Sequence, residues 1–358
     1  MSDLATPAVE FRSVSKRYGA VTALDDISFT IAQGTLVTLL GPSGCGKTTI
    51  LRLIAGLEQP SAGSIMIAGQ DVTLRAASER SISLVFQSYA LFPHMTVLEN
   101  VCYGLRASGV KKPRAIELAM EKLALVGLTG YERRLPSELS GGQQQRVAVA
   151  RAIVLEPQVL LFDEPLSNLD AKLRRRVREE IHELQQTLSL TALYVTHDQQ
   201  EALAISDRIM VMNMARVAQD GTPRGLYERP ASHFVADFIG DANIVPVMVE
   251  ALDGDVAQVR VGPLSLRVPH RGAAIGAAEL AVRPQSLLLM PGVAAPDALP
   301  GRIAKAAYLG SHMEYWVAAD GLSTELFIIG PDVATPLSVG AQVGIRLAGS
   351  GVAVVPRV

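Results

Sequence analysis

The sequence predicts an α/β domain with a parallel sheet, followed by a smaller all-β domain. Up to about residue 240, short apolar runs of strand length alternate with longer segments of helical periodicity. Strands that alternate with helices favour a parallel sheet covered on both faces. Beyond that point, short strand-like runs follow one another closely, separated by Gly and Pro, which is typical of a small barrel or sandwich. We therefore expect domains over residues 1–240 and 241–358.

The composition favours folded domains that neither span a membrane nor bind nucleic acid. Hydrophobic residues make up 49% and charged residues 19% of the 358 residues, so a sizeable core can form. A net charge of -2 gives no electrostatic reason to expect nucleic acid as a partner. The sequence has no run of about 18 apolar residues, and residues 1–10 lack the pattern of a signal peptide. Two cysteines, Cys45 and Cys102, cannot form a disulfide framework, which favours a reducing, cytoplasmic setting.

The first element with a chemical signature is the apolar strand Thr35–Leu40, which leads directly into a glycine-rich loop. This loop, Gly41–Thr48 (GPSGCGKT), matches G-x-x-x-x-G-K-[ST] and precedes a helical pattern. Its backbone N–H groups can surround phosphate oxygens, with Lys47 on the β- and γ-phosphates and Thr48 on Mg²⁺. A glycine-rich turn with an exposed lysine is the less favoured alternative. The expected nucleotide contacts are Gly41, Pro42, Ser43, Gly44, Cys45 (as a spacer), Gly46, Lys47, Thr48 and Thr49.

A second strand, Val159–Phe162, ends in two carboxylates within the sequence VLLFDEP. Asp163 is suited to hold Mg²⁺ through water, and Glu164 is suited to polarise an attacking water. Taken alone, an Asp-Glu pair is equally compatible with a solvated strand end. Combined with the phosphate loop, it predicts the catalytic half of a nucleotide site.

Two further strands end in the same way. Thr191–Val195 is followed by His197, for which we expect a γ-phosphate contact, although a lone histidine is usually structural. Ser81–Phe86 is followed by Gln87, which has the same placement and can sense Mg²⁺ and the water. The candidate catalytic residues are therefore Glu164, His197 and Gln87, and the candidate Mg²⁺ ligands are Thr48, Gln87 and Asp163.

A second anion site is predicted at the segment Leu139–Arg146 (LSGGQQQR). Ser140, Gly141 and Gly142 offer a hydroxyl and open backbone N–H groups at the start of the helix that follows. A simple helix cap uses the same groups, so that alternative stays open. One chain would then have two phosphate-binding helix starts for one ATP.

These motifs together resemble the ABC ATPases, and the resemblance covers about two-thirds of the chain. In family order it includes Tyr18, Gly41–Thr48, Gln87, the Ser140 motif, Asp163–Glu164, the loop Ser167–Asp170, and His197. The resemblance implies a P-loop NTPase with a RecA-like sheet and an ABC helical subdomain over about residues 88–157. It also implies a head-to-tail homodimer with two shared ATP sites.

The resemblance assigns further roles within that dimer. Ser140, Gly141, Gly142 and Gln143 of one copy would complete the site of the other. Tyr18 would stack on adenine, and Asp170 would help to couple the copies. The segment Gln87–Asn100 (QSYALFPHMTVLEN) is similar to the groove that receives a coupling helix from membrane subunits; its apolar residues Tyr89, Leu91, Phe92 and Met95 are divided between core and interface.

The all-β region resembles the C-terminal regulatory (TOBE-like, OB-like) domain of ABC importer ATPases for maltose, polyamine, phosphonate or ferric ion. Leu280–Leu287 (LAVRPQSL) resembles the Arg-Pro motif of that domain at Arg283 and Pro284, and Ala306–Tyr315 resembles its second β-unit. A merely stabilising β-appendage remains the alternative.

The predicted function is an ATP-hydrolysing subunit that energises an ABC importer for a small polar solute. Phe234–Ile244 and the stretch Gly310–His312 look most like the ferric-ion and polyamine groups; phosphonate or sugar is the alternative solute. An exporter ATPase and a non-transport ABC ATPase are the alternative classes. We expect ATP and Mg²⁺ as cofactors, integral membrane permease subunits as partners, an indirect periplasmic solute-binding protein, and a peripheral location on the cytoplasmic face of the inner membrane.

Overall fold

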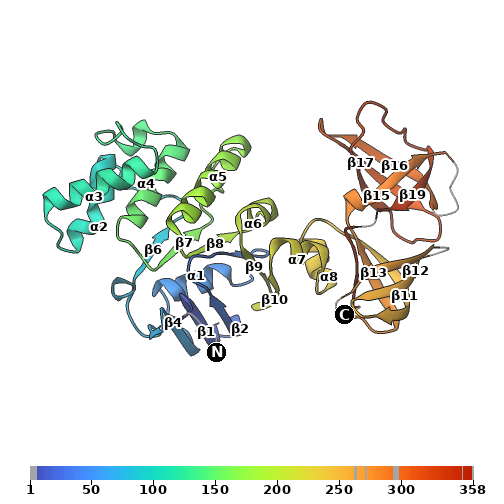
Figure 1. Cartoon of the computed structure of the whole chain (residues 1–358), viewed down its shortest axis with the longest axis horizontal. Helices are drawn as coiled ribbons and strands as arrows, with labels where there is room; N and C mark the ends of the chain where they lie inside the picture. The colour runs from blue at the N-terminus through green and yellow to red at the C-terminus, as the bar shows by residue number, and fades with distance from the viewer. Residues whose placement is uncertain (1–5, 262–263, 271, 293–297, 349, 357–358) are drawn as a thin grey trace. The chain divides into compact units, whose positions relative to one another are not determined.

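The computed structural model describes residues 6–261, 264–270, 272–292, 298–348 and 350–356 (Figure 1). The chain forms two compact units, Met1–Asp220 and Gly221–Val358. This division precedes the boundary expected after residue 240, because the short helices α7 (Pro223–Glu228) and α8 (His233–Phe238) belong to the second unit. Within the described residues, no helix has both the length and the apolar character that crossing a membrane requires.

The first unit contains two sheets. A six-stranded sheet has the order β10-β9-β3-β8-β7-β6, and a four-stranded sheet has the order β2-β1-β4-β5. The strands are β1 (Val9–Tyr18), β2 (Val21–Ile31), β3 (Leu36–Leu40), β4 (Ala62–Ile67), β5 (Gln70–Asp71), β6 (Ile82–Val85), β7 (Val159–Asp163), β8 (Ala192–Thr196), β9 (Arg208–Asn213) and β10 (Arg216–Gly221). The helices are α1 (Lys47–Ala55), α2 (Val97–Ala107), α3 (Lys112–Leu125), α4 (Gly141–Ile153), α5 (Ala171–Leu188) and α6 (Gln199–Ile205).

The six-stranded sheet contains the predicted parallel strands, since β6, β7, β8, β3 and β9 pair in parallel in that spatial order. Both faces of this sheet are buried, which explains why its strands are continuous apolar runs. Leu161 of β7 packs with α1 and the antiparallel strands, whereas its neighbours Leu160 and Phe162 pack with α4 and α5. The antiparallel sheet adds a layer that the sequence analysis did not predict.

The helical segment predicted over about residues 88–157 contains α2, α3 and α4. These helices share a core that includes Val101, Leu123 and Val147. Two of them begin with a capping box: Thr96 caps α2 through Glu99, and Ser140 caps α4.

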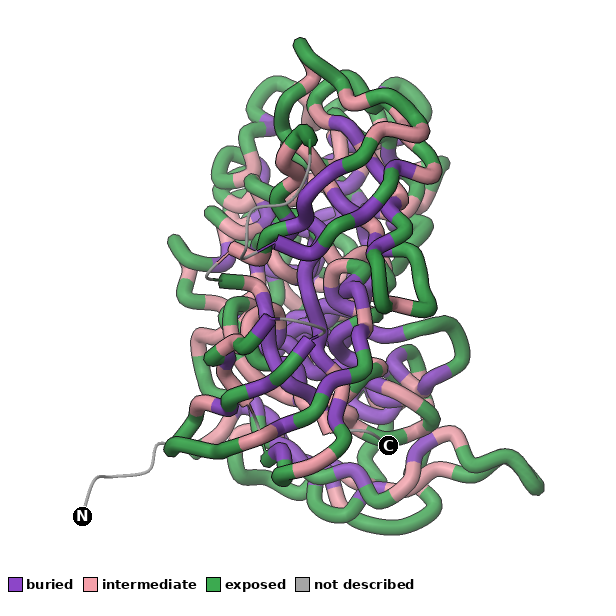
Figure 2. Tube along the Cα trace, turned by 90° about the vertical axis from the view of Figure 1, so that its right-hand side faces the viewer, coloured by how far each residue is buried: buried purple, intermediate pink, exposed green. Residues whose placement is uncertain are grey.

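In Figure 2 the interior segments of the chain are buried (purple), whereas the projecting loops are exposed (green).

The second unit contains two five-stranded sheets after α7 and α8, with the orders β13-β12-β11-β14-β20 and β15-β19-β16-β17-β18. The paired strands described in both sheets run antiparallel. The strands are β11 (Asn243–Asp253), β12 (Val256–Val261), β13 (Leu264–Pro269), β14 (Gly276–Val282), β15 (Leu287–Pro291), β16 (Leu299–Tyr308), β17 (Met313–Ala319), β18 (Leu326–Gly330), β19 (Gln342–Leu347) and β20 (Val352–Val355). One hydrophobic core joins residues from both sheets. The all-β prediction is thus confirmed, although β11 and β15 were not among the predicted strands.

Two buried polar side chains organise this second unit. The amide of Asn243 in β11 donates to the carbonyl of Phe327 (2.7 Å) and accepts from its N–H (2.6 Å), which links the two sheets. The guanidinium of Arg283, which is 2% exposed, donates to the carbonyls of Ala236 (2.6 Å) and Tyr227 (2.8 Å). Arg283 therefore holds α7 and α8 against the β-structure.

Candidate functional site

The glycine-rich loop lies between β3 and α1, as predicted, and its backbone leaves no room for larger residues at two positions. A Cβ on Gly41 would lie 2.5 Å from the carbonyl oxygen of Met212, and one on Gly46 would lie 2.7 Å from that of Ala23. Gly46 also has a φ of 109°, which L-residues rarely adopt, and it is the N-cap of α1. The open N–H groups of this helix start therefore face the loop, where they can bind an anion.

Lys47 is almost fully buried in this loop. Its ammonium donates to the carbonyls of Gly41 (2.7 Å) and Pro42 (2.9 Å) and lies 3.8 Å from the sulfur of Cys45. The positive charge is thus held inside the curve of the loop, where a phosphate group can reach it. Pro42, Ser43, Gly44 and Thr48 are exposed along the same segment.

Tyr18, at the end of β1, lies beside the first turn of α1. Partial burial and a hydrogen bond with Glu58 raise the pKa of its hydroxyl, whereas a hydrogen bond with Thr49 lowers that pKa. The ammonium of Lys16 lies 4.8 Å from the centroid of the ring. With 45% of its surface exposed next to the phosphate loop, Tyr18 is available to stack on a base.

The carboxyl ends of β7 and β8 bring Glu164 and His197 together. Oε2 of Glu164 lies 3.1 Å from Nδ1 of His197. The N–H of Glu164 donates to the carbonyl of Val195 in β8 at 3.0 Å. Glu164 has a φ of 46°, a left-handed conformation that costs energy and is common at functional sites. The parallel pairing of β7 with β8 therefore places these two side chains at one edge of the sheet.

Gln87, after the neighbouring strand β6, joins the same edge through the loop Ser167–Asp170. Its side-chain amide donates to the hydroxyl of Ser167 (3.1 Å). Its backbone carbonyl accepts from the side-chain amide of Asn168 (3.1 Å). Ser167 in turn donates to the carbonyl of Glu164 at 3.0 Å. Gln87 and Glu164 are thus connected through one serine.

Asp163 lies deeper than Glu164 and next to two cations. Burial, followed by the nearby charge of Glu164, raises the pKa of Asp163; Arg52 and Lys47 oppose that rise. A cavity of about 280 Å³ is lined by residues of α1 and of the strand ends, and its lining includes Asp163 and Glu58. Lys47 of the phosphate loop thus acts electrostatically on Asp163 at the end of β7.

The donor set suits Mg²⁺ better than a transition metal. Among the described residues, no group of three or more His, Cys, Asp and Glu side chains forms a metal cage. Mg²⁺ instead prefers one or two carboxylates combined with substrate phosphates and water. Thr48, Gln87 and Asp163 supply hydroxyl, amide and carboxylate oxygens of that kind.

Ser140 lies in a different part of the unit. Its hydroxyl accepts from the N–H of Gln143 (3.4 Å), and its own N–H donates to Oε1 of that side chain (2.9 Å). Added Cβ atoms on Gly141 and Gly142 would contact Leu169 and Leu173, near the start of α5. In the described part of the chain, no hydrogen bond joins Ser140, Gly141, Gly142 or Gln143 to the phosphate loop. A single chain thus contains two separate helix starts of this kind. Asp170 caps α5 by accepting from the N–H of Leu173 at 3.0 Å.

In the segment after Gln87, Tyr89 is buried, whereas Met95 is only partly buried. Tyr89 is 6% exposed and packs against α4 and α5. Met95 instead lines a groove of about 690 Å³ together with Leu98, Tyr103 and Ile116. The amide of the fully buried Asn100 binds the carbonyls of Phe92, Met95 and Thr96 and accepts from the N–H of Phe92, so that one side chain sets this path.

Several residues at the site were missed by sequence reasoning. Arg52 and Glu58 face Asp163 from α1 and the turn after it. Arg174, Asp198 and Glu201 lie behind Glu164 and His197. The sequence carries a weak signal for Asp198 and Glu201, because Asp is a favoured residue at the N-cap of a helix and Glu201 lies in the first turn that follows.

Comparison with known proteins identifies the family. The family described as "ABC transporter" matches residues 24–167, and the "TOBE domain" family matches residues 280–355. "Fe(3+) ions import ATP-binding protein FbpC 1" of Rhizobium meliloti (strain 1021) is 57% identical over 99% of both chains. The chain is an ABC transporter ATP-binding protein.

Two other relatives and a solved structure agree with this assignment. The ABC ATPase is 58% identical to "Fe(3+) ions import ATP-binding protein FbpC" of Agrobacterium fabrum (strain C58 / ATCC 33970), over 97% of this chain and 98% of the relative. It is 53% identical to the protein of the same name from Escherichia coli O157:H7, over 78% and 79% of the two chains. A structure of cbiO1 from Clostridium perfringens, part of the ABC transporter complex cbiONQ, aligns with a TM-score of 0.58 and 27% identity, covering 62% of this chain and 91% of that one.

The comparisons confirm the fold class and the function predicted from the sequence at the level of the family. ABC ATPases of this type bind and hydrolyse ATP to drive transport as part of a transporter complex. The TOBE match falls within the all-β region, where the sequence analysis expected it.

Proposed function

We propose that this ABC ATPase binds MgATP between two copies of the chain and hydrolyses it to energise the import of ferric ion. The observation that carries the proposal is the convergence of Gln87, Asp163, Glu164 and His197 at one sheet edge, beside the loop of Lys47. Ferric ion is favoured over polyamine, phosphonate and sugar because the ferric-import relatives match 97–99% of the chain at 57–58% identity.

In this proposal, the protein's own groups position ATP and activate water. The N–H groups of the phosphate loop and the ammonium of Lys47 bind the β- and γ-phosphates. Glu164 accepts the proton of the attacking water as its oxygen bonds to the γ-phosphorus and the bond to ADP breaks, releasing phosphate. His197, held against Glu164 at 3.1 Å, faces the γ-phosphate, and Gln87 orients the water.

Thr48, Gln87 and Asp163 would hold Mg²⁺. When bound, the ion supplies positive charge that offsets the charge on the phosphate oxygens. The same positive charge would favour the ionised form of Asp163, against the burial that raises its pKa.

The second copy supplies the remaining half of each site. Ser140–Gln143 forms a helix start at which the Ser140 side chain is exposed, and no hydrogen bond among the described residues joins it to the phosphate loop. A head-to-tail pair would place this segment of one copy over the γ-phosphate of the other and produce two equivalent ATP sites.

The membrane partners would bind in the groove lined by α2 and α3. Its wall contains apolar side chains from Met95, Leu98 and Ile116, and Tyr103 is 47% exposed there. We propose that a short helix of an integral permease subunit occupies this groove, so that the ATPase is held peripherally at the cytoplasmic face of the inner membrane. A periplasmic binding protein would deliver the solute to the permease without contacting this chain.

The catalytic part of the proposal is tested with Glu164→Gln. Loss of a general base is expected to slow hydrolysis by about 10²–10⁴-fold, while nucleotide binding persists. Mixing the variant with MgATP should produce a stable dimer in size-exclusion chromatography, whereas the parent returns to monomer as ATP is consumed. Hydrolysis at the parent rate would exclude Glu164 as the base, and a nucleotide complex that stays monomeric would exclude the shared site.

The solute is tested by uptake in cells that lack the chromosomal copy of this chain. Cells supplied with the parent chain should accumulate radioactive ferric iron, and cells supplied with Glu164→Gln should not. Uptake of labelled spermidine, phosphonate or maltose serves as the comparison. Ferric uptake that is independent of Glu164, or ATP-dependent uptake of another solute alone, would contradict the assignment of ferric ion.

A further inference from the structure

Behind the pair Glu164–His197 lies a small chamber of about 80 Å³ whose wall is unusually rich in charge. The wall contains three carboxylates, one guanidinium, one imidazole and two hydroxyl groups. The lining residues are Glu164, Ser167, Arg174, Thr196, His197, Asp198 and Glu201. Arg174 is thus the one arginine in a wall that also contains the carboxylates of Glu164, Asp198 and Glu201.

Glu201 fixes the strand that leads to His197. Its carboxylate is 4% exposed, and Oε2 accepts from the hydroxyls of Thr196 (2.8 Å) and Tyr194 (3.2 Å), both in β8. Burial raises the pKa of Glu201, and the hydrogen bond from Thr196 opposes that rise. The end of β8, just before His197, is thus hydrogen-bonded to α6 through Glu201.

Asp198 fixes the chain immediately after His197. Its N–H donates to the hydroxyl of Thr196 at 3.0 Å, and its Oδ1 caps α6 by accepting from the N–H of Glu201 at 3.1 Å. The imidazole of His197 is itself largely exposed, with a side-chain exposure of 60%. Its position against Glu164 therefore depends on the two residues that flank it in sequence.

Arg174 connects this assembly to the loop Ser167–Asp170. One terminal nitrogen donates to the carbonyl of Leu169 (3.1 Å), and the other donates to Oδ2 of Asp198 (3.4 Å). Nε lies 3.8 Å from Oε1 of Glu201. Because a guanidinium is planar and rigid, a shift of the Leu169 carbonyl cannot occur without a shift at Asp198 or the loss of a hydrogen bond.

We propose that Arg174 is a positioning residue that sets His197 against Glu164 according to the state of the loop Ser167–Asp170. The inference rests on the proposed function, in which two copies share each ATP site, and on the family resemblance, which implies that Asp170 in this loop helps to couple the copies. When the second copy orders the loop, the Leu169 carbonyl fixes the guanidinium, which fixes Asp198 and hence His197. Arg174 itself contacts neither ATP nor the attacking water.

The experiment compares Arg174→Met with a matched arginine on the same helix. Arg178, one turn further along α5, also reaches α6, where it donates to the carbonyl of Gln200 at 3.3 Å, but it is not linked to Leu169 or Asp198. Arg174→Met should lower kcat by about 10–100-fold, since small misplacements of a catalytic group have effects of that size. It should also lower the Hill coefficient for ATP towards one, with the dissociation constant for ATP unchanged. Arg178→Met should keep the parent kcat and Hill coefficient.

A conservative variant and a double variant separate positioning from general stability. Arg174→Lys keeps the charge but lacks the rigid planar guanidinium that couples the two partners, so it should recover only part of kcat. If Arg174 acts through His197, adding Arg174→Met to His197→Ala should cause no further loss of kcat. Multiplicative losses in the double variant, a parent-like Arg174→Met, or equal losses in Arg174→Met and Arg178→Met would each overturn the inference.

The same set of variants distinguishes this failure from failure of the proposed function. If Glu164→Gln abolishes hydrolysis while Arg174→Met behaves like the parent, only the role of Arg174 is excluded. If Glu164→Gln hydrolyses ATP at the parent rate, the proposed catalytic site is wrong, and the inference about Arg174 is overturned with it.

Discussion

The two units of this chain use buried polar residues for different purposes. In the first unit, the charge of Lys47 opposes the rise in the pKa of Asp163, and Asp163 lines a cavity of about 280 Å³. In the second unit, Arg283 and Asn243 use their polar atoms on the backbone of their own unit. Lys47 also binds backbone carbonyls of its own loop, so a buried polar group is a sign of chemistry only where its charge also acts on a group that lines a ligand-sized space.

This difference also affects how a motif should be interpreted. The Arg-Pro pair at Arg283 and Pro284 resembles a regulatory motif, yet the guanidinium binds the carbonyls of Tyr227 and Ala236 and stacks 4.3 Å from the ring of Tyr227. Its pKa is lowered because it is buried. The motif therefore attaches two helices to a β-unit, and the contrast with Lys47 can be tested by removing each charge.

Arg283→Met should have the largest effect on stability. The substitution leaves the carbonyls of Tyr227 and Ala236 without donors in a buried setting, at a cost of about 1–3 kcal/mol for each. The loss should appear in hydrogen exchange as faster exchange over α7 and α8. Arg260→Met is the control, since Arg260 pairs with Glu250 at a side-chain exposure of 64% and should cost no more than about 1 kcal/mol. Unchanged exchange in Arg283→Met would mean that other contacts hold these helices.

Lys47→Ala should have a smaller energetic effect, and on binding rather than on folding. A charged donor contributes about 1.5–3 kcal/mol, so the dissociation constant for ATP should rise by about 10–100-fold. Fluorescence titration with a labelled ATP analogue measures it directly. Lys305→Ala, a lysine of the other unit, should bind like the parent. If both variants bound ATP equally well, the role of Lys47 would be limited to its hydrogen bonds within the loop, as the role of Arg283 is limited to hydrogen bonds within its own unit.

The ease of prediction depends on whether the signal is contiguous in the sequence. The phosphate loop and the Asp163–Glu164 pair were predicted because each is a contiguous segment whose glycines or carboxylates follow an apolar strand. The link between Gln87 and Ser167 joins residues 80 positions apart, and only the parallel pairing of β6 with β7 brings them together. The strand β11 was missed although a two-residue turn after Asp253 joins it to β12; its other edge pairs with β14, which lies 27–39 positions later in the sequence.

Asp163→Asn tests whether the first unit maintains its site at a cost to stability. Burial raises the pKa of Asp163, so the folded state favours the protonated form, and the parent loses this stability as the pH rises through that pKa. Asp163→Asn should therefore raise the melting temperature at pH 7 while reducing hydrolysis. The gain should vanish below the ordinary pKa of 3.8, where the carboxyl is protonated in both states.

Asp71→Asn is the control of opposite sign for that experiment. Hydrogen bonds from Thr73 lower the pKa of Asp71, so its stabilisation is present above 3.8 and disappears in acid. The variant should melt at a slightly lower temperature than the parent at pH 7. If Asp163→Asn were also destabilising at pH 7, the idea that this carboxylate is held at a cost would be wrong.

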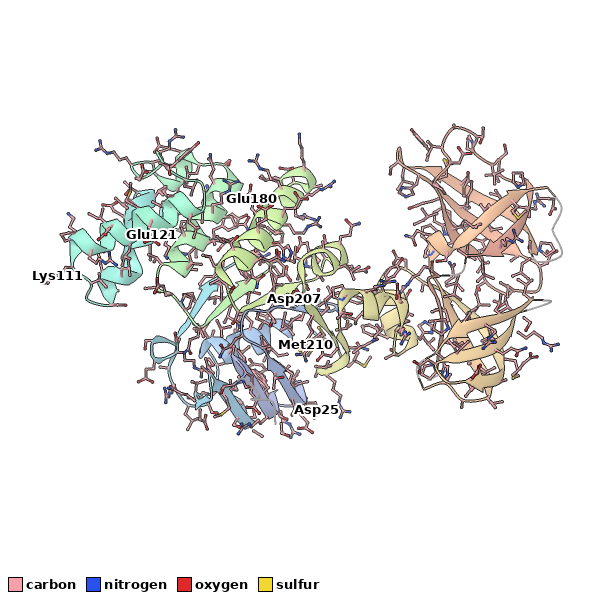
Figure 3. All side chains as sticks on the ribbon, in the orientation of Figure 1. Asp25, Lys111, Glu121, Glu180, Asp207 and Met210 are labelled. Atoms are coloured by element: carbon pink, nitrogen blue, oxygen red, sulfur yellow. The ribbon has the colours of Figure 1, made fainter. Side chains whose placement is uncertain are left out.

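The smallest effect is expected one residue beyond Arg174. Arg175 forms an exposed ion pair with Glu179 on the surface of α5, at 3.3 Å with side-chain exposures of 77% and 57%. Arg175→Ala should change the free energy of unfolding by no more than about 0.5 kcal/mol and leave kcat and the Hill coefficient unchanged. Figure 3 shows how the side chains of α5, including the labelled Glu180, surround the helix. Because Arg174 and Arg175 share a helix, a charge and nearly the same position in the sequence, any difference in kcat between their variants reports the face of α5 on which the guanidinium lies. Equal kcat values for the two variants would mean that Arg174 affects hydrolysis no more than the exposed Arg175 does.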